Sequence, residues 1–125
     1  MTGNEQPAST RLQGWARLAR VFIGEMDKVS GRPLHEAIVI AAREQGIAGV
    51  TVLRGVASYG ASSVLHTARI LRLSEDLPMV VEIVDDDERI EEFLRTLDDL
   101  LAEAGSGGLI TLEKVEVIRY LPKGT

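Results

Sequence analysis

The chain has no cysteine among its 125 residues, which excludes disulfide bonds, thiolate metal sites and cysteine nucleophiles. Long hydrophobic runs are also missing, because no apolar stretch approaches the roughly 20 residues that a membrane-spanning helix needs. Basic residues are outnumbered, 14 against 19 acidic ones, and the net charge of −5 argues against non-specific binding to DNA or anionic membranes. We therefore expect neither a nucleic-acid partner nor insertion into a membrane.

What the chain does have is the composition of one globular domain. Its length fits a single domain, and an apolar share of 45% is ordinary for a folded protein. Residues 1–13 are polar and lack the apolar core of a secretory signal, so we predict a disordered tail there and a folded domain over residues 14–122. Without such a signal and without cysteine, we predict a cytoplasmic location.

The first half of the domain reads as a strand followed by a helix. Trp15–Ile23 is rich in β-branched and apolar residues, which favours a strand. Residues 25–32 are polar and carry a turn signal. Pro33 suits the first turn of a helix, and the apolar stripe that follows it, ended by Gly46, predicts a helix over Leu34–Gln45.

Two strands separated by a long connection come next. Val50–Ala57 is predicted to be a strand, in which Gly55 indicates a bulge or a close backbone approach. Residues 58–77 show only weak periodicity, and a connection of that length is usually functional or mobile. Met79–Val84 is almost entirely apolar and is predicted to be the next strand.

The last two elements are a helix and a strand. The spacing of apolar residues over Ile90–Ala104 predicts a helix with one buried face. Asp85–Glu88 precede it, where the helix dipole favours anions, and Gly105–Gly108 ends it. Val115–Leu121 alternates in the manner of a strand.

The order β-α-β-β-α-β predicts a ferredoxin-like α+β fold: one four-stranded antiparallel sheet with both helices on one face. The other face of the sheet is then left uncovered, since Val80, Val84, Val115 and Val117 cannot all point toward the helices. An uncovered apolar face is an aggregation hazard unless other subunits cover it. We therefore expect an oligomer.

Three segments carry a resemblance to a known family. Gly46–Gly55, Asp76–Asp85 and Leu112–Tyr120 resemble the DUF190 family of uncharacterised prokaryotic PII-like proteins, and the likeness runs from about Trp15 to Leu121. More distantly, the same segments are similar to PII nitrogen-regulatory proteins. That resemblance implies a homotrimer with nucleotide sites in the clefts between subunits. It also implies a long loop after the second strand that docks onto a transporter or an enzyme.

The resemblance to PII weakens where phosphate would bind. Val56–Gly60 resembles the start of the PII effector loop, and Ser106–Ile110 occupies the place of the Gly-Asp-Gly-Lys-Ile turn. In that turn the lysine is replaced by Leu109, and the basic residue expected shortly after Arg119 is replaced by Leu121. Two charges that would hold a triphosphate are absent, so the resemblance does not extend to ATP binding in the PII manner.

The ligand-binding residues that the resemblance implies lie in the long connection, the glycine-rich turn and the last segment. They are Gly55, Ser58, Tyr59, Gly60, Gly107, Gly108 and Arg119. The glycine-rich turn has two interpretations, a helix C-cap or a nest of backbone N–H groups that accepts an anion. Arg54, Arg69 and Arg72 likewise either converge on a phosphate or are ordinary surface and ion-pair arginines.

No catalytic or metal-binding constellation emerges. Asp85–Asp87 lacks the spacing of a calcium loop and is interpreted as helix capping, and neither His35 nor His66 has a partner at metal-ligand spacing. We therefore predict a regulatory sensor, not an enzyme, that binds a small anion such as an adenine nucleotide and signals through residues 58–77. A cofactor cannot be named. The alternatives are a small metal-binding or assembly module of the same fold, or an enzyme.

Overall fold

A computed structural model of the chain describes residues 12–58, 66–67 and 76–124. Its elements are β1 (Gly14–Gly24), β2 (Lys28–Val29), β3 (Arg32–Pro33), α2 (Leu34–Glu44), β4 (Gly49–Arg54), β5 (Ala57–Ser58), β6 (His66–Thr67), β7 (Pro78–Asp85), α3 (Asp87–Ala104) and β8 (Leu109–Val117). The predicted tail over residues 1–13 falls almost wholly outside the described part, and the domain bounds of 14–122 stay a prediction.

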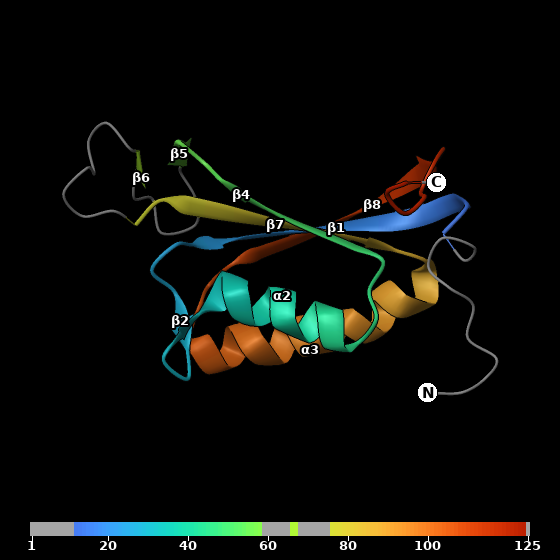
Figure 1. The fold of residues 1–125 in the computed structure, drawn as a ribbon. Coiled ribbons are helices and arrows are strands. Elements are labelled where there is room, and N and C mark those ends of the chain that lie inside the picture. Colours follow the sequence, from blue (N-terminus) through green and yellow to red (C-terminus); the bar gives the residue numbers. More distant parts are fainter. Residues whose placement is uncertain (1–11, 59–65, 68–75, 125) are drawn as a thin grey trace.

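Four of these strands form one antiparallel sheet in the order β4-β7-β1-β8. The strands β1 and β4, which flank α2 in the chain, are therefore separated in the sheet by β7. Both helices lie on the same side of this sheet (Figure 1). The predicted ferredoxin-like α+β fold, with its helices on one face, is confirmed.

The core lies between the sheet and the two helices. Every second residue of the central strands points into it, as the alternation of side chains along a strand requires. Val21 and Val81 are fully buried there, and Phe93 of α3 is the largest fully buried side chain. Burial of each such side chain contributes about 1.5–3 kcal/mol, so truncation of any of them should be costly.

The ends of α3 are set by two residues. Asp86 is the N-cap, and its side chain accepts a hydrogen bond from the backbone N–H of Arg89 at 2.8 Å. Gly105 ends the helix in the left-handed conformation, with φ of 67°, which a glycine adopts without strain. The capping interpretation of the acidic run is thus confirmed at Asp86.

Neither helix covers the opposite face of the sheet, which we call the open face (Figure 1). It is not exposed throughout, because Ala16 on this face is only 4% exposed. The strand register places all four valines of the sequence argument on this open face: Val80 beside Phe22, Val84 beside Leu18, Val115 beside Ala16 and Val117 beside Gly14. Leu53, Val80, Phe22 and Leu109 form one continuous row across all four strands, which we call the apolar row.

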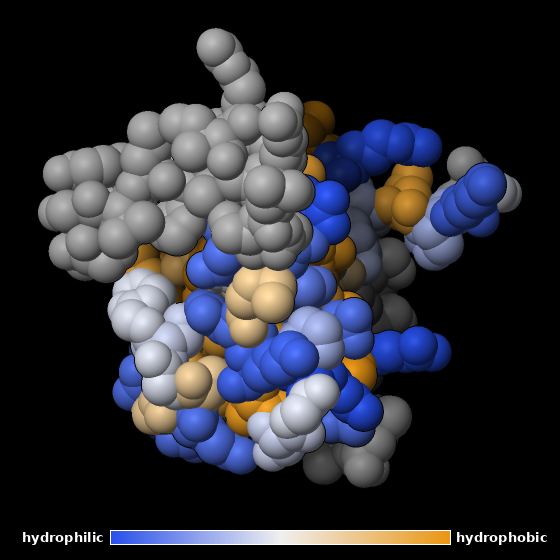
Figure 2. Space-filling view, turned by 90° about the vertical axis from the view of Figure 1, so that its left-hand side faces the viewer, coloured by the Kyte–Doolittle hydropathy of each residue, from blue (hydrophilic) through white to orange (hydrophobic). Residues whose placement is uncertain are grey.

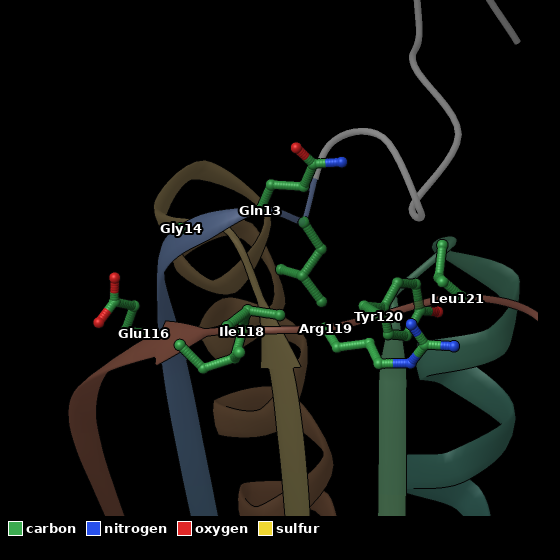
Figure 3. Close-up of a pocket in the computed structure, with 9 residues that line it drawn as sticks. Gln13, Gly14, Glu116, Ile118, Arg119, Tyr120 and Leu121 are labelled. Carbon is green, nitrogen blue, oxygen red and sulfur yellow. The ribbon is translucent and has the colours of Figure 1, made fainter.

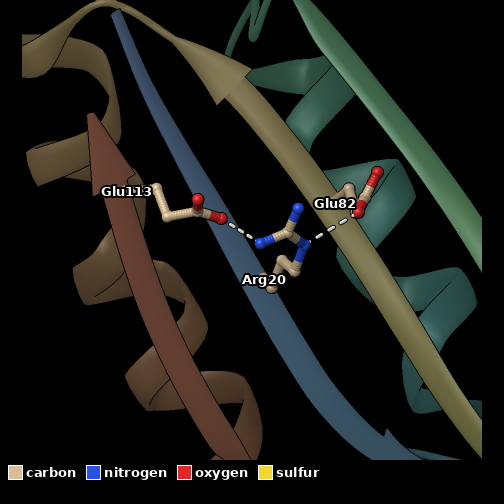
Figure 4. Close-up of polar contacts among 3 residues, drawn as sticks. All are labelled: Arg20, Glu82 and Glu113. Carbon is tan, nitrogen blue, oxygen red and sulfur yellow. Dashed lines mark hydrogen bonds and ion pairs between the residues drawn. The ribbon is translucent and has the colours of Figure 1, made fainter. Parts of the chain in front are cut away.

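A charged cluster follows the apolar row on the same face. Arg20 donates a hydrogen bond from Nε to Glu82 on β7 at 2.9 Å, and another from its guanidinium to Glu113 on β8 (Figure 4). The bond to Glu82, more than the bond to Glu113, raises the pKa of Arg20 above its ordinary value. The three strands β7, β1 and β8 are therefore bridged by one permanently charged side chain.

Two strand predictions were wrong in their bounds. The last strand runs over Leu109–Val117 and not Val115–Leu121, because β1 begins at Gly14, whose partner is Val117. Beyond Val117, the described residues offer no further strand for pairing. The second strand ends at Arg54, where Gly55 interrupts it before the short β5.

Candidate functional site

The predicted ligand-binding residues fall at two opposite ends of the sheet. At one end, which we call the loop end, β1 and β4 finish while β7 and β8 begin. The loop end comprises residues 24–27, 55–58, 76–78 and 105–108 and lies at the left of Figure 1. Figure 2 looks directly onto it, and hydrophilic side chains dominate the part that is coloured.

Gly55 lies directly against the start of β7. Its N–H donates to the carbonyl of Pro78 at 2.7 Å, and a Cβ on Gly55 would lie only 2.8 Å from Cγ of the proline ring. The predicted close backbone approach at Gly55 is confirmed. Any larger residue here would separate the end of β4 from the start of β7.

Ser58 is paired with a residue that sequence reasoning did not connect to it. The short strand β5 pairs antiparallel with β6, and this register sets Ser58 opposite His66. A ladder of two residues has no periodicity to detect, so only the structure reveals the pair. The neighbouring candidates Tyr59 and Gly60, and the arginines Arg69 and Arg72, lie outside the described residues.

The glycine-rich turn caps the helix, which is one of its two predicted roles, and two of its N–H groups could still serve the other, anion binding. The N–H groups of Gly105 and Ser106 donate to Ala102 and Leu101, which completes the helix cap. The N–H groups of Gly107 and Gly108 have no hydrogen-bond partner among the described residues. They remain available to an anion, the second interpretation of this turn.

One carboxylate connects the glycine-rich turn to the end of β1. Oδ2 of Asp27 accepts hydrogen bonds from Ser106 Oγ at 2.9 Å and from the N–H of Gly24 at 3.0 Å. The carbonyl of Asp27 also accepts from the N–H of Leu34 at 2.8 Å, at the first turn of α2. The polar stretch after the first strand is thus a structural hairpin that joins three elements.

The loop end is rich in negative charge. Arg54 pairs with Glu25 at 2.5 Å, which is the ion-pair interpretation of this arginine. Asp76 accepts a hydrogen bond from the N–H of Met26 at 3.0 Å. Asp27 and Asp76 both have carboxylate oxygens within 3.4 Å of the position that a Cβ on Gly24 would take.

Arg119 lies at the other end of the sheet, beside a hollow of about 450 Å³ (Figure 3). We call it the C-terminal hollow. It is lined by two segments, residues 12–14 and residues 116–121. Gln13, Arg119 and Tyr120 supply its polar groups, while Glu116 points away from them (Figure 3). Sequence reasoning missed this hollow, because it depends on where β8 stops.

A buried carboxylate lies behind Tyr120, one of the residues that line the C-terminal hollow. Tyr120 donates from its hydroxyl to the carbonyl of Ala48 at 2.5 Å, and the N–H of Ala48 donates to Asp85 at 2.9 Å. Asp85 is fully buried, and its other oxygen accepts from the N–H of Asp86 at 2.7 Å. A residue assigned to helix capping from the sequence therefore anchors the turn onto which Tyr120 docks.

Gly55, Ser58, Gly107 and Gly108 are brought to the loop end, and Arg119 is not. The eleven residues of β1 separate the two ends by roughly 34 Å, at about 3.4 Å per residue. No group of three or more potential metal ligands occurs among the described residues. Within the same part of the chain, no helix is long and apolar enough to cross a membrane.

The fold is that of the PII-like proteins. The nitrogen regulatory PII-like protein CPII of Thiomonas intermedia K12, solved with ADP, AMP and bicarbonate, superimposes with a TM-score of 0.65 at 11% identity, covering 84% of this chain and 90% of that one. A protein of Thermus thermophilus, described as a putative PII-like signaling protein, superimposes with a TM-score of 0.60 at 15% identity. The match covers 84% of this chain and 91% of that one.

Comparison of sequences identifies the family to which this chain belongs. The model of the DUF190 family (Uncharacterized ACR) matches residues 16–117. A UPF0166 protein of Aquifex aeolicus is 37% identical over 102 residues, which are 82% of this chain and 92% of that protein. A UPF0166 protein of Methanocaldococcus jannaschii is 32% identical over 90 residues, 72% and 82% of the two chains. The chain belongs to the DUF190 family, and the predicted resemblance is confirmed.

Proposed function

We propose that the protein is a PII-like regulatory subunit that binds a small anionic ligand between neighbouring copies of itself. This proposal rests on the separation of the candidate residues between the two ends of the sheet. The N–H groups of Gly107 and Gly108, unpaired among the described residues, lie at the loop end. Arg119 lies at the other end of the sheet, roughly 34 Å away at about 3.4 Å per strand residue. One chain cannot use both for one small ligand, but two adjacent chains can.

The open face supports the assembly that this site needs. The apolar row leaves Leu53 48%, Phe22 37% and Leu109 57% exposed in the single chain. Burial of these side chains against other copies stabilises the assembly by about 25 cal/mol for each Å² of apolar surface removed from water. We propose a homotrimer formed through this face, the arrangement that the resemblance to PII implies.

The ligand proposed is an adenine nucleotide with few phosphates. CPII, which shares the fold, is described as bound to ADP and AMP. Among the described residues, Arg119 is the one cation that lines the C-terminal hollow, and the glycine-rich turn adds only backbone N–H groups. One guanidinium and two N–H donors suit one phosphate group better than three.

Ligand binding at the loop end gives residues 58–77 their proposed role. Both ends of this connection, Ser58 on β5 and Leu77 next to β7, belong to the loop end. A ligand that prefers one conformation of the connection shifts its population, and a protein target such as a transporter or an enzyme then reads that shift. We propose that this takes place in the cytoplasm.

Thermal unfolding with AMP, ADP, ATP and a divalent metal tests the proposal. A nucleotide at about 100 times its dissociation constant stabilises the native state by about 2.7 kcal/mol. We expect stabilisation by AMP or ADP, its loss in Arg119→Ala, and a trimer mass by light scattering. A monomer, or a protein stabilised by the metal and by no nucleotide, would overturn the proposal. A trimer that responds to neither would identify an assembly module.

A further inference from the structure

Asp27 is in contact with both halves of the loop end. On one side its Oδ2 holds Ser106, the residue before Gly107 and Gly108, at 2.9 Å. On the other side the same oxygen accepts from the N–H of Gly24 at 3.0 Å, and the N–H of Asp27 donates back to the carbonyl of Gly24 at 3.2 Å. The turn Gly24–Asp27 is therefore closed by one backbone hydrogen bond and by the carboxylate of Asp27.

The same turn is attached to the start of β7 by two hydrogen bonds. The N–H of Glu25 donates to the carbonyl of Leu77 at 2.8 Å, and the N–H of Met26 donates to Asp76 at 3.0 Å. A continuous chain of contacts thus leads from Ser106 through Asp27 and the turn to Asp76. The glycine-rich turn and the residues before β7 are joined through it, although they lie about 30 positions apart in the sequence.

We propose that Asp27 is the positioning residue of the proposed ligand site. It sets the glycine-rich turn in register with Asp76 and Leu77, so that occupancy of the Gly107 and Gly108 N–H groups alters the start of β7. This inference rests on the proposed function. It adds the route by which binding reaches the end of the 58–77 connection, and it assigns that role to the hairpin inserted after the first strand.

The geometry allows the hydrogen-bond acceptor of Asp27 to be tested separately from its negative charge. Both hydrogen bonds to the Asp27 side chain end on the one oxygen Oδ2, so an asparagine amide oxygen in that place can accept both. Oδ1 lies near the carboxylate of Asp76, beside Gly24. The substitution Asp27→Asn would place an amide N–H₂ there and remove the repulsion between two carboxylates. Asp27→Asn therefore preserves the junction, and Asp27→Ala removes it.

A double-mutant cycle on the unfolding equilibrium tests the junction without any ligand. Ser106→Ala and Asp76→Ala remove the two ends of the contact chain. We expect their effects on the equilibrium constant to combine non-additively by about threefold or more, whereas independent sites combine within about twofold. The coupling should vanish in an Asp27→Ala background and persist with Asp27→Asn. Ser30→Ala, which removes a bond to Glu103 from the same hairpin, is the matched control. Independent effects of Ser106→Ala and Asp76→Ala would overturn the junction.

Titration with AMP tests the connection to the ligand. We expect Asp27→Ala to weaken AMP binding about tenfold and Asp27→Asn to bind as the unmodified protein does. Unchanged affinity in both Asp27→Ala and Ser106→Ala, while Arg119→Ala abolishes binding, would overturn the positioning role and leave the proposed function intact. If the unmodified protein binds no nucleotide, the proposed function and the ligand-positioning role both fail, and the unfolding cycle still decides whether the junction exists.

Discussion

The hydroxyl of Tyr120 donates to the carbonyl of Ala48 at 2.5 Å, which fastens the segment after the last strand to the turn between α2 and β4. β8 has already ended at Val117, so no strand ladder among the described residues holds this segment in place. The position of Arg119, one residue before the tyrosine, therefore depends on a side-chain contact and not on the sheet.

Tyr120→Phe tests this dependence, because it removes the hydroxyl and retains the ring. A hydrogen bond of this kind contributes about 1 kcal/mol, and we expect a loss of that size in the free energy of unfolding by urea denaturation. Ligand affinity should fall as well, since the guanidinium of Arg119 loses its fixed position. Arg119→Ala is the control, because the lost side chain is not part of the core and stability should change little. Equal stability of Tyr120→Phe and the unmodified protein would contradict the anchoring role.

Asp85→Asn should be more damaging than its small change in shape suggests. The two oxygens of Asp85 accept from two different N–H groups, those of Ala48 and Asp86. An asparagine would turn its own N–H₂ toward one of these donors in a fully buried position, which leaves a donor unsatisfied. We expect a loss of about 1–3 kcal/mol in the free energy of unfolding.

Asp87→Asn is the matched control for that experiment. Asp87 is mostly exposed and pairs with Arg17 at 2.7 Å, and a surface ion pair contributes about 0–1 kcal/mol. A cost for Asp87→Asn as large as that for Asp85→Asn would contradict the role assigned to the buried carboxylate.

Charge introduced into the apolar row should break the assembly while sparing the fold. Phe22 is 37% exposed on the open face of the single chain, so Phe22→Glu leaves the core of the subunit unchanged. In the assembly the carboxylate would be buried without a partner, at a cost of several kcal/mol. We expect a monomer by light scattering with an unchanged far-ultraviolet circular dichroism spectrum.

Ile40→Glu provides the comparison. Ile40 has nearly the same exposure, 39%, but it lies on α2, on the other side of the sheet. The oligomeric mass of this variant should equal that of the unmodified protein. If Ile40→Glu dissociates the assembly and Phe22→Glu does not, the interface lies on the helices.

The fold was accessible from the sequence because its elements have strong periodic signals. The sequence of α3 combines an apolar stripe, an aspartate at its N-terminus and a glycine at its C-terminus, all of which predict the same helix. The bounds of β8 were not accessible, because they depend on where β1 begins to offer a partner. The expectation that the four valines cannot all face the helices did not depend on those bounds, since alternation fixes the face and not the ends of a strand, and the register puts Val115 and Val117 on the open face.

The candidate site was accessible only in part, for a related reason. Gly55 indicates a close approach by its residue type, and the structure supplies the partner, Pro78. The roles of Asp27 and Asp85 depend on contacts between residues far apart in the chain. The residue type alone does not show whether an aspartate caps a helix, anchors a turn or faces solvent. Such contacts are decided by the packing of the hairpin and the terminal segment.

The glycine-rich turn offers the last prediction, a comparison of two neighbouring glycines. A Cβ on Gly108 would lie 2.7 Å from Cδ2 of Leu101, and Gly108 has a positive φ of 22°. A Cβ on Gly107 would meet nothing within 4 Å. We expect Gly108→Ala to lower the free energy of unfolding by about 1–3 kcal/mol, the usual range for strain of this kind, and Gly107→Ala to change it by less than about 0.5 kcal/mol. Both variants keep the backbone N–H, so Gly107→Ala should retain ligand binding. Gly107→Pro removes that N–H, and if binding survives it, Gly107 does not donate to the ligand.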